Sequence, residues 1–297
     1  MFKRVLSLLV ALGAVVAALV VLPAATAQAA TCFSAWNSSS VYTGGQTASH
    51  NGRNYTAKWW TQNERPGSSD VWADNGACGT GGGGGEDPGQ SNGFVVSEAQ
   101  FNQMFPNRNS FYTYQGLTDA LSAYPAFANT GSDEIKKREA AAFLANVSHE
   151  TGGLVYIKEV NEANYPHYCD ATQPYGCPAG QSAYYGKGPI QLSWNFNYKA
   201  AGDALGIDLL NNPYLVEQNA AVAWKTALWY WNTQTGPGTI TGHNAIVNGP
   251  GFGETIRSIN GAIECNGGNP AQVQSRIDKF TQFTQVLGTT TGSNLSC

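Results

Sequence analysis

The chain has 297 residues and carries 16 basic against 20 acidic side chains, a formal charge of −4 with the histidines neutral. This acidic balance argues against nucleic acid as a partner, because binding to phosphates requires clustered positive charge. Only 12% of the residues are charged while 11% are aromatic. Such a composition suits a protein that presents rings to an uncharged polymer, and a neutral carbohydrate fits that description.

The first residues have the features of a secretory signal. Two basic residues precede an uncharged apolar run over residues 5–22, and an Ala-Gln-Ala cleavage pattern stands at positions 27–29. A membrane helix is the alternative, since the run is nearly long enough to span a bilayer, but the break at Pro23 favours cleavage. We therefore expect residues 1–29 to be removed and the protein to be secreted to the extracellular space without a membrane anchor.

Six cysteines, an even number in an exported chain, can all be oxidised to disulfides. Their positions along the chain suggest three pairs of neighbours: Cys32 with Cys78, Cys169 with Cys177, and Cys265 with Cys297. Six cysteines allow fifteen pairings, so this connectivity is a prediction. A zinc site is the alternative, but the sequence has no C-x-x-C or H-E-x-x-H spacing, and we expect no metal site.

Residues 30–79 are predicted to form a small β-sheet module closed by Cys32 and Cys78. The segment is too short for a large hydrophobic core, and it alternates turn signals with aromatic runs. Trp59 and Trp60 are adjacent, and neighbouring side chains of a regular strand point to opposite faces, so one of them is expected in the core unless the chain bulges. An exposed indole can stack on the apolar face of a sugar ring.

The stretch from Ala57 to Thr61, with Trp36, Trp72 and the flanking cysteines, resembles the small chitin-binding domains of carbohydrate-binding families 5 and 12. The resemblance covers the whole module and implies chitin as its partner. It also implies that three outward-facing rings bind the chitin surface: Tyr42, Trp59 and Trp60.

Residues 80–93 are predicted to be a flexible linker. They contain five consecutive glycines, Gly81 to Gly85, followed by small and polar residues. Such a stretch cannot bury apolar surface and behaves as a tether. A tether lets one module hold a surface while the other acts nearby.

Residues 94–297 are predicted to form a mainly helical domain. Ser97 and Gln100 make a capping box at the start of a first helix. A charged, Ala-rich helix is expected over about residues 133–150.

Two further helices are expected towards the end of the chain. A strongly apolar segment over residues 220–231 is predicted to be a helix whose aromatic side chains lie in the core. The last helix is predicted to begin at Asn269-Pro270 and to end at Gly288.

Glu150 is the best candidate for the protonated carboxylic acid that hydrolysis of a glycoside requires. Two glycines, Gly152 and Gly153, end the preceding helix, so the carboxyl lies beside the free carbonyls of the last turn. Negative charge is unfavourable there, which favours the protonated form that a general acid needs. The alternative is a solvated glutamate at a helix end without a catalytic role.

Glu159 follows nine positions later, beyond the Gly-Gly turn, and is the candidate for the second carboxylate. A return of the chain across a cleft would place it opposite Glu150. A separation of about 6.5–9.5 Å would leave room for a water molecule and predict inversion at the anomeric carbon. Glu162 is the competing candidate for the base. Alternatively, either glutamate could lie in a surface loop and have no catalytic role.

Two other segments carry polar groups suited to a sugar cleft. Residues 184–195 are predicted to form a glycine- and proline-containing loop that leads into a helix. A packed surface turn without a binding role would have the same sequence pattern. In residues 259–265, Asn260 can donate to an acetamide or hold water. Glu264 can pair with Arg276 and so tune a nearby acid, although such pairs are more often structural.

Together these four segments resemble glycoside hydrolase family 19, the inverting chitinases with a lysozyme-like helical fold, over essentially all of residues 94–297. The resemblance implies a mainly α catalytic domain of lysozyme-like α+β type. It implies Glu150 as the general acid, Glu159 as the general base, and Ser193 as the residue that holds the attacking water with the base. Further positions implied in the substrate cleft or in its support are Gln191, Asn197, Lys225, Asn260, Glu264 and Arg276.

The resemblance also matches the Cys169–Cys177 and Cys265–Cys297 disulfides of that family. One family disulfide has no counterpart in this domain, and the spacing from acid to base is shorter than in the longer plant members. Several cleft loops are therefore expected to be missing, as in the compact bacterial type.

The sequence thus predicts a secreted chitinase that cleaves β-1,4 links within the N-acetylglucosamine polymer by inversion. Growth on chitin and an antifungal role would select the same chemistry. A muramidase acting on peptidoglycan is the nearest enzyme alternative, and a chitin-binding lectin with an inert second domain is another. Two carboxylates and a water suffice, so we expect no cofactor, and we expect a monomer.

Overall fold

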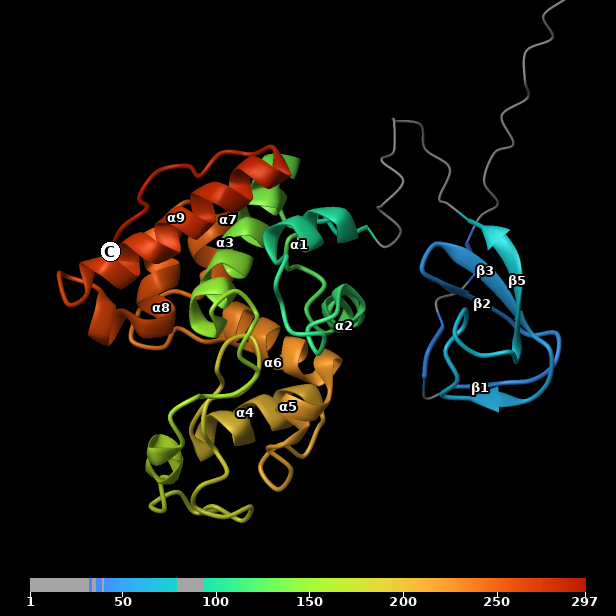
Figure 1. Cartoon of the computed structure of the whole chain (residues 1–297), viewed down its shortest axis with the longest axis horizontal. Helices are drawn as coiled ribbons and strands as arrows, with labels where there is room; N and C mark the ends of the chain where they lie inside the picture. The colour runs from blue at the N-terminus through green and yellow to red at the C-terminus, as the bar shows by residue number, and fades with distance from the viewer. Residues whose placement is uncertain (1–31, 34–35, 39, 79–92) are drawn as a thin grey trace, which may run out of the picture. The chain divides into compact units, whose positions relative to one another are not determined.

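The computed structural model describes residues 32–33, 36–38, 40–78 and 93–297. The expected signal peptide, residues 1–29, and the expected linker up to residue 92 lie outside them. The chain divides into two units, residues 1–83 and 84–297, and Figure 1 draws both.

The first unit is built from short antiparallel strands (Figure 1). One sheet has the order β2-β3-β5, and a two-stranded sheet pairs β1 with β4. The strands are β1 (Val41–Tyr42), β2 (Thr47–His50), β3 (Arg53–Ala57), β4 (Thr61–Gln62) and β5 (Trp72–Ala77). The hairpin from β2 to β3 turns at Asn51-Gly52, both with positive φ, a geometry that follows the twist of the paired strands.

The core of this unit is small. Five buried residues form it: Ala48, Tyr55, Ala57, Val71 and Trp72. The predicted Cys32–Cys78 disulfide is present and closes the unit from end to end. So few buried side chains contribute little hydrophobic stabilisation, and a covalent closure of this kind offsets that deficit.

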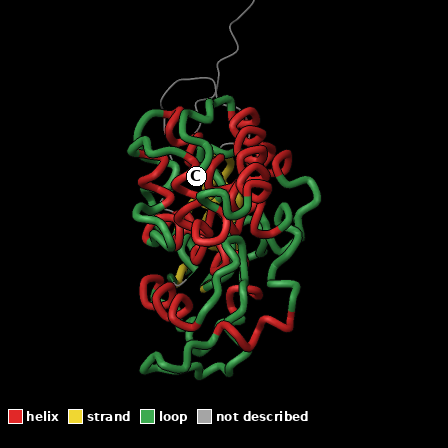
Figure 2. Tube along the Cα trace, turned by 90° about the vertical axis from the view of Figure 1, so that its left-hand side faces the viewer, coloured by secondary structure: helices red, strands yellow, loops and turns green. Residues whose placement is uncertain are grey.

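The second unit is mainly helical, as predicted, with long loops between its helices (Figures 1 and 2). Its α-helices are α1 (Glu98–Met104), α2 (Tyr114–Ala120), α3 (Asp133–Thr151), α4 (Asn195–Leu205), α5 (Leu215–Gln218), α6 (Ala220–Thr233), α7 (Gly242–Val247), α8 (Phe252–Glu264) and α9 (Pro270–Leu287). Two short 3-10 helices are η1 (Leu121–Ala123) and η2 (Glu162–Tyr168).

Helix α3 is the central element, and α9 runs beside it (Figure 1). Ser132 caps its first turn by accepting from the Ile135 amide, and Gly152 ends it in the left-handed conformation, with φ 61°. Residues 139–148 are buried on all sides, because α3 also contacts α7 and α8. The last turn of α3 therefore stands in a fixed position on a rigid support.

The other predicted helix boundaries are confirmed. Ser97 and Gln100 form the capping box of α1. Asn269 caps α9, whose first residue is Pro270, and Gly288 ends it with φ 61°. The aromatic side chains of α6 lie in the core, with Trp224 fully buried. Local capping chemistry thus determined where these helices start and stop.

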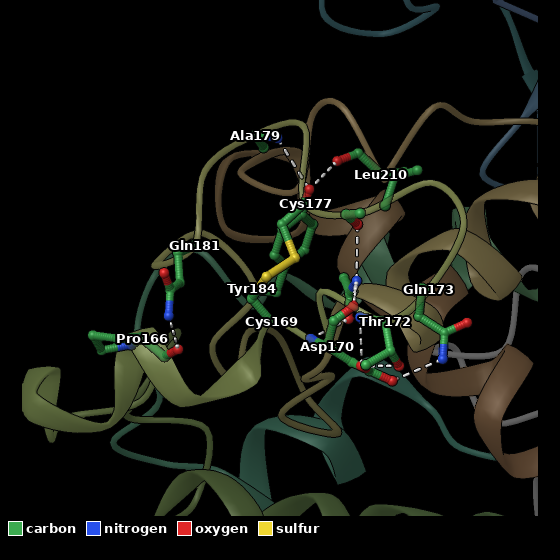
Figure 3. The surroundings of a disulfide bond; sticks show 12 residues. Pro166, Cys169, Asp170, Thr172, Gln173, Cys177, Ala179, Gln181, Tyr184 and Leu210 are labelled. Carbon is green, nitrogen blue, oxygen red and sulfur yellow. Dashed lines mark hydrogen bonds between the residues drawn. A yellow bond between two sulfur atoms is a disulfide. The ribbon is translucent and has the colours of Figure 1, made fainter.

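The two predicted disulfides of the second unit are also present, Cys169–Cys177 and Cys265–Cys297. Figure 3 shows the loop closed by the first. Asp170 accepts hydrogen bonds from Thr172 and Gln173 within this loop (Figure 3). The Tyr184 hydroxyl donates to the carbonyl of Leu210 and accepts from the amide of Ala179 (Figure 3). The Asp170 amide donates to Asn195 Oδ1, and Asn195 Nδ2 donates to the carbonyls of Asp170 and Gly176, so this loop is fastened to the end of residues 184–195.

Within the described part of the chain, no helix is both long enough and apolar enough to cross a membrane. The same residues contain no group of three or more histidine, cysteine, aspartate or glutamate side chains placed to hold a metal ion.

Candidate active site

Glu150 lies in the last turn of α3 and lines a pocket of about 400 Å³. The lining combines the segment 190–194 with the end of η2, the first turn of α4, one residue of α6 and two residues of α8. The residues that line it are Glu150, Tyr168, Ile190, Gln191, Leu192, Ser193, Trp194, Asn197, Tyr230, Ile259 and Asn260. A polar cleft of this size, with one carboxyl at its wall, is suited to a sugar unit.

One oxygen of Glu150 is held by a buried arginine. The Arg276 guanidinium, fully buried on α9, donates from Nη2 to Glu150 Oε1 at 2.5 Å. It also donates to both oxygens of Glu264, from Nε at 2.8 Å and from Nη2 at 2.7 Å. One guanidinium therefore binds two carboxylates, and the pair predicted between Glu264 and Arg276 exists and touches the candidate acid.

The buried pair has two further partners. Arg276 Nη1 donates to Asn146 Oδ1 at 3.1 Å, and Asn146 is itself fully buried on α3. Asn260 Nδ2 donates to Glu264 Oε1 at 2.8 Å. Helix α8 departs from helical geometry at Asn260, and Asn260 also lines the pocket. The network thus connects α3, α8 and α9 behind the cleft wall.

Electrostatics follow from this arrangement. Burial alone would raise the pKa of Glu264, but the hydrogen bond and charge of Arg276, with the bond from Asn260, outweigh it and lower that pKa. Burial and then the charge of Arg276 lower the pKa of His149, the neighbour of Glu150. Burial and the charge of Glu150 raise the pKa of Tyr230, which lines the pocket, to about 12. Glu264 therefore stays ionised beside Arg276, while His149 and Tyr230 stay neutral near neutral pH.

Glu159 stands on a short extended segment beyond the end of α3. Its amide donates to Gly186 O at 2.8 Å, and its carbonyl accepts from the Tyr165 hydroxyl at 2.8 Å. Asn164 Nδ2 donates to its Oε1 at 2.7 Å. Its Oε2 is buried and has no hydrogen-bond partner among the residues that the structure describes. One oxygen of Glu159 is thus fixed by η2, and the other is enclosed by protein.

Tyr168 connects Glu159 with the pocket. Glu159 is not among the residues that line the pocket, whereas Tyr168 is. Burial first, and then interaction with the Glu159 carboxylate, raise the pKa of Tyr168 to about 12. The competing candidate, Glu162, is exposed and pairs with Lys158 at 3.6 Å. This surface position favours Glu159 over Glu162 as the second carboxylate.

Ser193 lies between two residues with left-handed backbone conformations, Gln191 with φ 51° and Trp194 with φ 75°. Residues other than glycine rarely adopt a backbone conformation with positive φ, and such strain concentrates at functional sites. Asn197 Nδ2 donates to the Ser193 carbonyl at 3.0 Å. Gln191, Ser193 and Asn197, all predicted cleft residues, therefore lie in the pocket wall together.

Lys225 is half-buried on α6 and is not among the residues that line this pocket. Glu264 and Arg276 are also outside the lining, but they reach Glu150 through the hydrogen bonds given above. The sequence interpretation missed Tyr168 and Tyr230. It also missed Asn164, which binds Glu159, and Asn146, which binds Arg276. Their only sequence signal was proximity to other candidates, because each acts through a tertiary contact.

In the first unit, both adjacent tryptophans are exposed, Trp59 by 54% and Trp60 by 61%. The expectation that one of them lies in the core is wrong, because both fall between β3 and β4, outside any strand alternation. Tyr42 is half-buried, with its ring edge-on to Trp72 at 5.1 Å. Because Tyr42 pairs with Thr61 in the two-stranded sheet, it lies next to the Trp59-Trp60 segment.

Comparison with known proteins gives two family matches. Residues 95–297 match the chitinase class I model of glycoside hydrolase family 19, and residues 35–73 match carbohydrate-binding module family 5/12. The crystal structure of chitinase C from Streptomyces griseus is similar, with 83% sequence identity and a TM-score of 0.69, over 90% of this chain and 100% of that chain.

Two plant proteins are similar at lower identity. Endochitinase A of Zea mays is 45% identical over 210 residues, which cover 68% of this chain and 71% of that protein. Inactive chitinase-like protein 1 of Hevea brasiliensis is 39% identical over 249 residues, which cover 73% of this chain and 78% of that protein.

Proposed function

The chain belongs to the chitinase class I family of glycoside hydrolases, and on this premise we propose that it cleaves β-1,4 links inside the chitin chain with inversion at the anomeric carbon. One observation carries the proposal: Glu150 lines a polar pocket with one oxygen bound by Arg276. Because an inactive relative exists at 39% identity, activity depends on particular side chains and not on the fold alone.

Glu150 is proposed as the general acid. Its Oε1 accepts from Arg276, so Oε2 is the atom that carries the proton to the glycosidic oxygen as the link to the anomeric carbon breaks. The carboxylate that remains is stabilised by the same guanidinium. Arg276 also binds both oxygens of Glu264, so its buried charge has a partner whether or not Glu150 carries the proton.

Glu159 is proposed as the general base and Ser193 as the residue that orients the water. The base takes a proton from water while the oxygen attacks the anomeric carbon from the face opposite the leaving group. Asn164 donates to Oε1 of Glu159, which orients the carboxylate that accepts that proton. Exchange with solvent then returns both carboxyls to their starting states.

The remaining cleft roles are proposed on the same basis. Gln191, Asn197 and Asn260 line the pocket with amide groups that suit sugar hydroxyls and acetamides. Lys225 is proposed to contact substrate outside the lining described above. Tyr42, Trp59 and Trp60 are proposed to hold insoluble chitin, since flat exposed rings stack on sugars.

Residues 1–29 are proposed as a cleaved signal, and the protein as a secreted monomer that uses no cofactor. Fungal wall chitin is a proposed target, which would make an antifungal role compatible with this chemistry. A muramidase is not favoured, because the matched family model is that of chitinases. An inert second domain is not favoured, because Glu150 lines the pocket with one oxygen bound by Arg276.

The mechanism is tested by the anomeric form of the first product. We expect NMR of the early hydrolysis mixture to show the α-anomer, because inversion turns a β-link into an α-hemiacetal. Early accumulation of the β-anomer would refute inversion. In parallel, Glu150→Gln should abolish turnover while adsorption to chitin is retained, and an active variant would remove Glu150 as the acid.

A further inference from the structure

Lys187 is fully buried between the two segments that carry the proposed base and the water-binding serine. An ammonium group in such a position is costly unless all its donors find acceptors. The mechanism above makes no use of it, so its burial has to be explained by another role.

The backbone of Lys187 pairs with the segment that leads to Ser193. Its amide donates to Leu192 O at 3.1 Å, and the Leu192 amide donates to Lys187 O at 2.9 Å. This reciprocal pair fixes the residue directly before Ser193 against the backbone of Lys187. The position of Ser193 therefore follows that of Lys187.

The opposite side of the same stretch pairs with the segment that carries the base. The Glu159 amide donates to Gly186 O at 2.8 Å, and the Gly188 amide donates to Ile157 O at 2.7 Å. Lys187 lies between these two bonds and forms a bridge with Lys158. Residues 186–188 thus lie between the segments of Glu159 and Ser193 and set the spacing between them.

The side chain of Lys187 anchors residues 186–188 through hydrogen bonds to neighbouring segments. Its Nζ donates to Ala183 O at 2.5 Å, to Tyr198 Oη at 3.2 Å and to Tyr185 O at 3.5 Å. The Tyr198 hydroxyl donates its own proton to Tyr185 O at 2.9 Å, so its lone pairs face the ammonium. The three N–H groups of a protonated lysine therefore have three acceptors, the number that the charged form requires.

Aromatic rings add to the preference for the charged form. Nζ lies 3.5 Å from the ring centroid of Tyr185, 4.9 Å from that of Tyr198 and 5.3 Å from that of Tyr214. Faces of tyrosine rings attract cations, and more strongly where water is excluded. The site is thus built for a cation, although no substrate atom needs to reach it.

Several charged groups face this site from neighbouring elements. Glu217 on α5 accepts from the Tyr185 hydroxyl at 3.2 Å with each oxygen. Burial lowers the pKa of Lys187 to about 7, the charge of Glu217 opposes this shift, and Lys158 adds to it. The charge of Lys187 is therefore present in mildly acidic solution and is lost in alkaline solution.

We propose that Lys187 is a positioning residue whose buried ammonium holds residues 186–188 in place and so maintains the spacing between Glu159 and Ser193. The inference rests on the proposed roles of those two residues. A shift of the segment would misplace the attacking water relative to the sugar without removing any group that binds the sugar. The expected signature is a loss in kcat at nearly constant KM, since a misplacement of about 1 Å can cost about 100-fold in rate.

The test compares Lys187→Met, Lys187→Arg and the exposed control Lys279→Met on soluble chitin oligomers. We expect Lys187→Met to lower kcat by about 10- to 100-fold with KM within about twofold of the control. Lys187→Arg should restore most of the activity, and its kcat should persist to higher pH than that of the natural protein, because a guanidinium stays charged. A structural defect alone would not move this pH limit.

A Lys187→Met variant with control-like kcat overturns the inference, and so does a folded Lys187→Arg variant that is as slow as Lys187→Met. If Lys187→Met does not fold, Tyr198→Phe takes its place, because it removes one acceptor and keeps the ring. A lower kcat at constant KM then supports the inference, and an unchanged kcat overturns it. Glu159→Gln separates the two levels: an active Glu159→Gln variant refutes the proposed base, whatever Lys187 does.

Discussion

Replacement of Arg276 by lysine should damage both catalysis and stability, because one guanidinium binds three side chains at once. It contacts Glu150, Glu264 and Asn146 from a fully buried position. A lysine keeps the positive charge, but its ammonium is a point donor on a flexible stem and cannot reproduce the planar fork. At least one carboxylate or amide of the network is then left without its partner.

The size of the effect follows from these contacts. Breaking a buried ion pair costs about 3–5 kcal/mol, and retention of the charge places Arg276→Lys near about 3 kcal/mol. For a domain of this size, that corresponds to a drop of about 6–12 °C in Tm. The rate should fall by about 100-fold, the lower end of what a positioned general acid contributes, because the acid remains but is no longer held.

Thermal unfolding followed by circular dichroism and kcat on soluble chitin oligomers measure the two effects separately. Adsorption to insoluble chitin serves as the control and should not change, since the exposed tryptophans belong to the other unit. A variant that melts within about 2 °C of the natural protein and keeps its kcat would show that the fork is dispensable, and the reasoning would be wrong.

Two further predictions concern stability and adsorption. The hydrogen bond from His243 to Glu139 raises the pKa of His243, against the effect of burial, so the stabilisation is complete below about pH 6.5 and is lost as the pH rises through the raised value. The free energy of unfolding that His243→Gln removes should therefore be larger at about pH 5.5 than at about pH 8.5, and equal losses would contradict this pairing. Trp60→Ala should weaken adsorption to insoluble chitin while kcat on soluble oligomers stays within about twofold, because the exposed ring and the pocket of Glu150 belong to different units. Parallel losses on both substrates would contradict that independence.

Helix boundaries were predictable because they depend on residues that are neighbours in sequence. Ser97 with Gln100 satisfies free amides of the first turn of α1, and the Asn269 side chain accepts from the Gln272 amide in α9, where Pro270 has no amide to satisfy. Gly152 ends α3 because a left-handed residue is needed there. These signals placed Glu150 at a helix end before any tertiary contact was known.

The supporting contacts of the site were not predictable in the same way. Asn146 and Arg276 are 130 positions apart, and they meet only because α3 packs on α9. The sequence pattern of the Trp59-Trp60 pair was misleading for a related reason. Strand alternation applies only within a strand, and the pair lies in the connection between β3 and β4, where a two-residue period has no meaning.

The left-handed conformations of Gln191 and Trp194 limit how the cleft can be redesigned. A β-branched residue at either position would clash with its own backbone, whereas glycine or asparagine would keep the course of the chain. A saturation library at these two positions should therefore return a narrow set of active clones. Efforts to broaden the choice of oligosaccharide should begin instead at Asn197 or Ile259, which line the same pocket from helices.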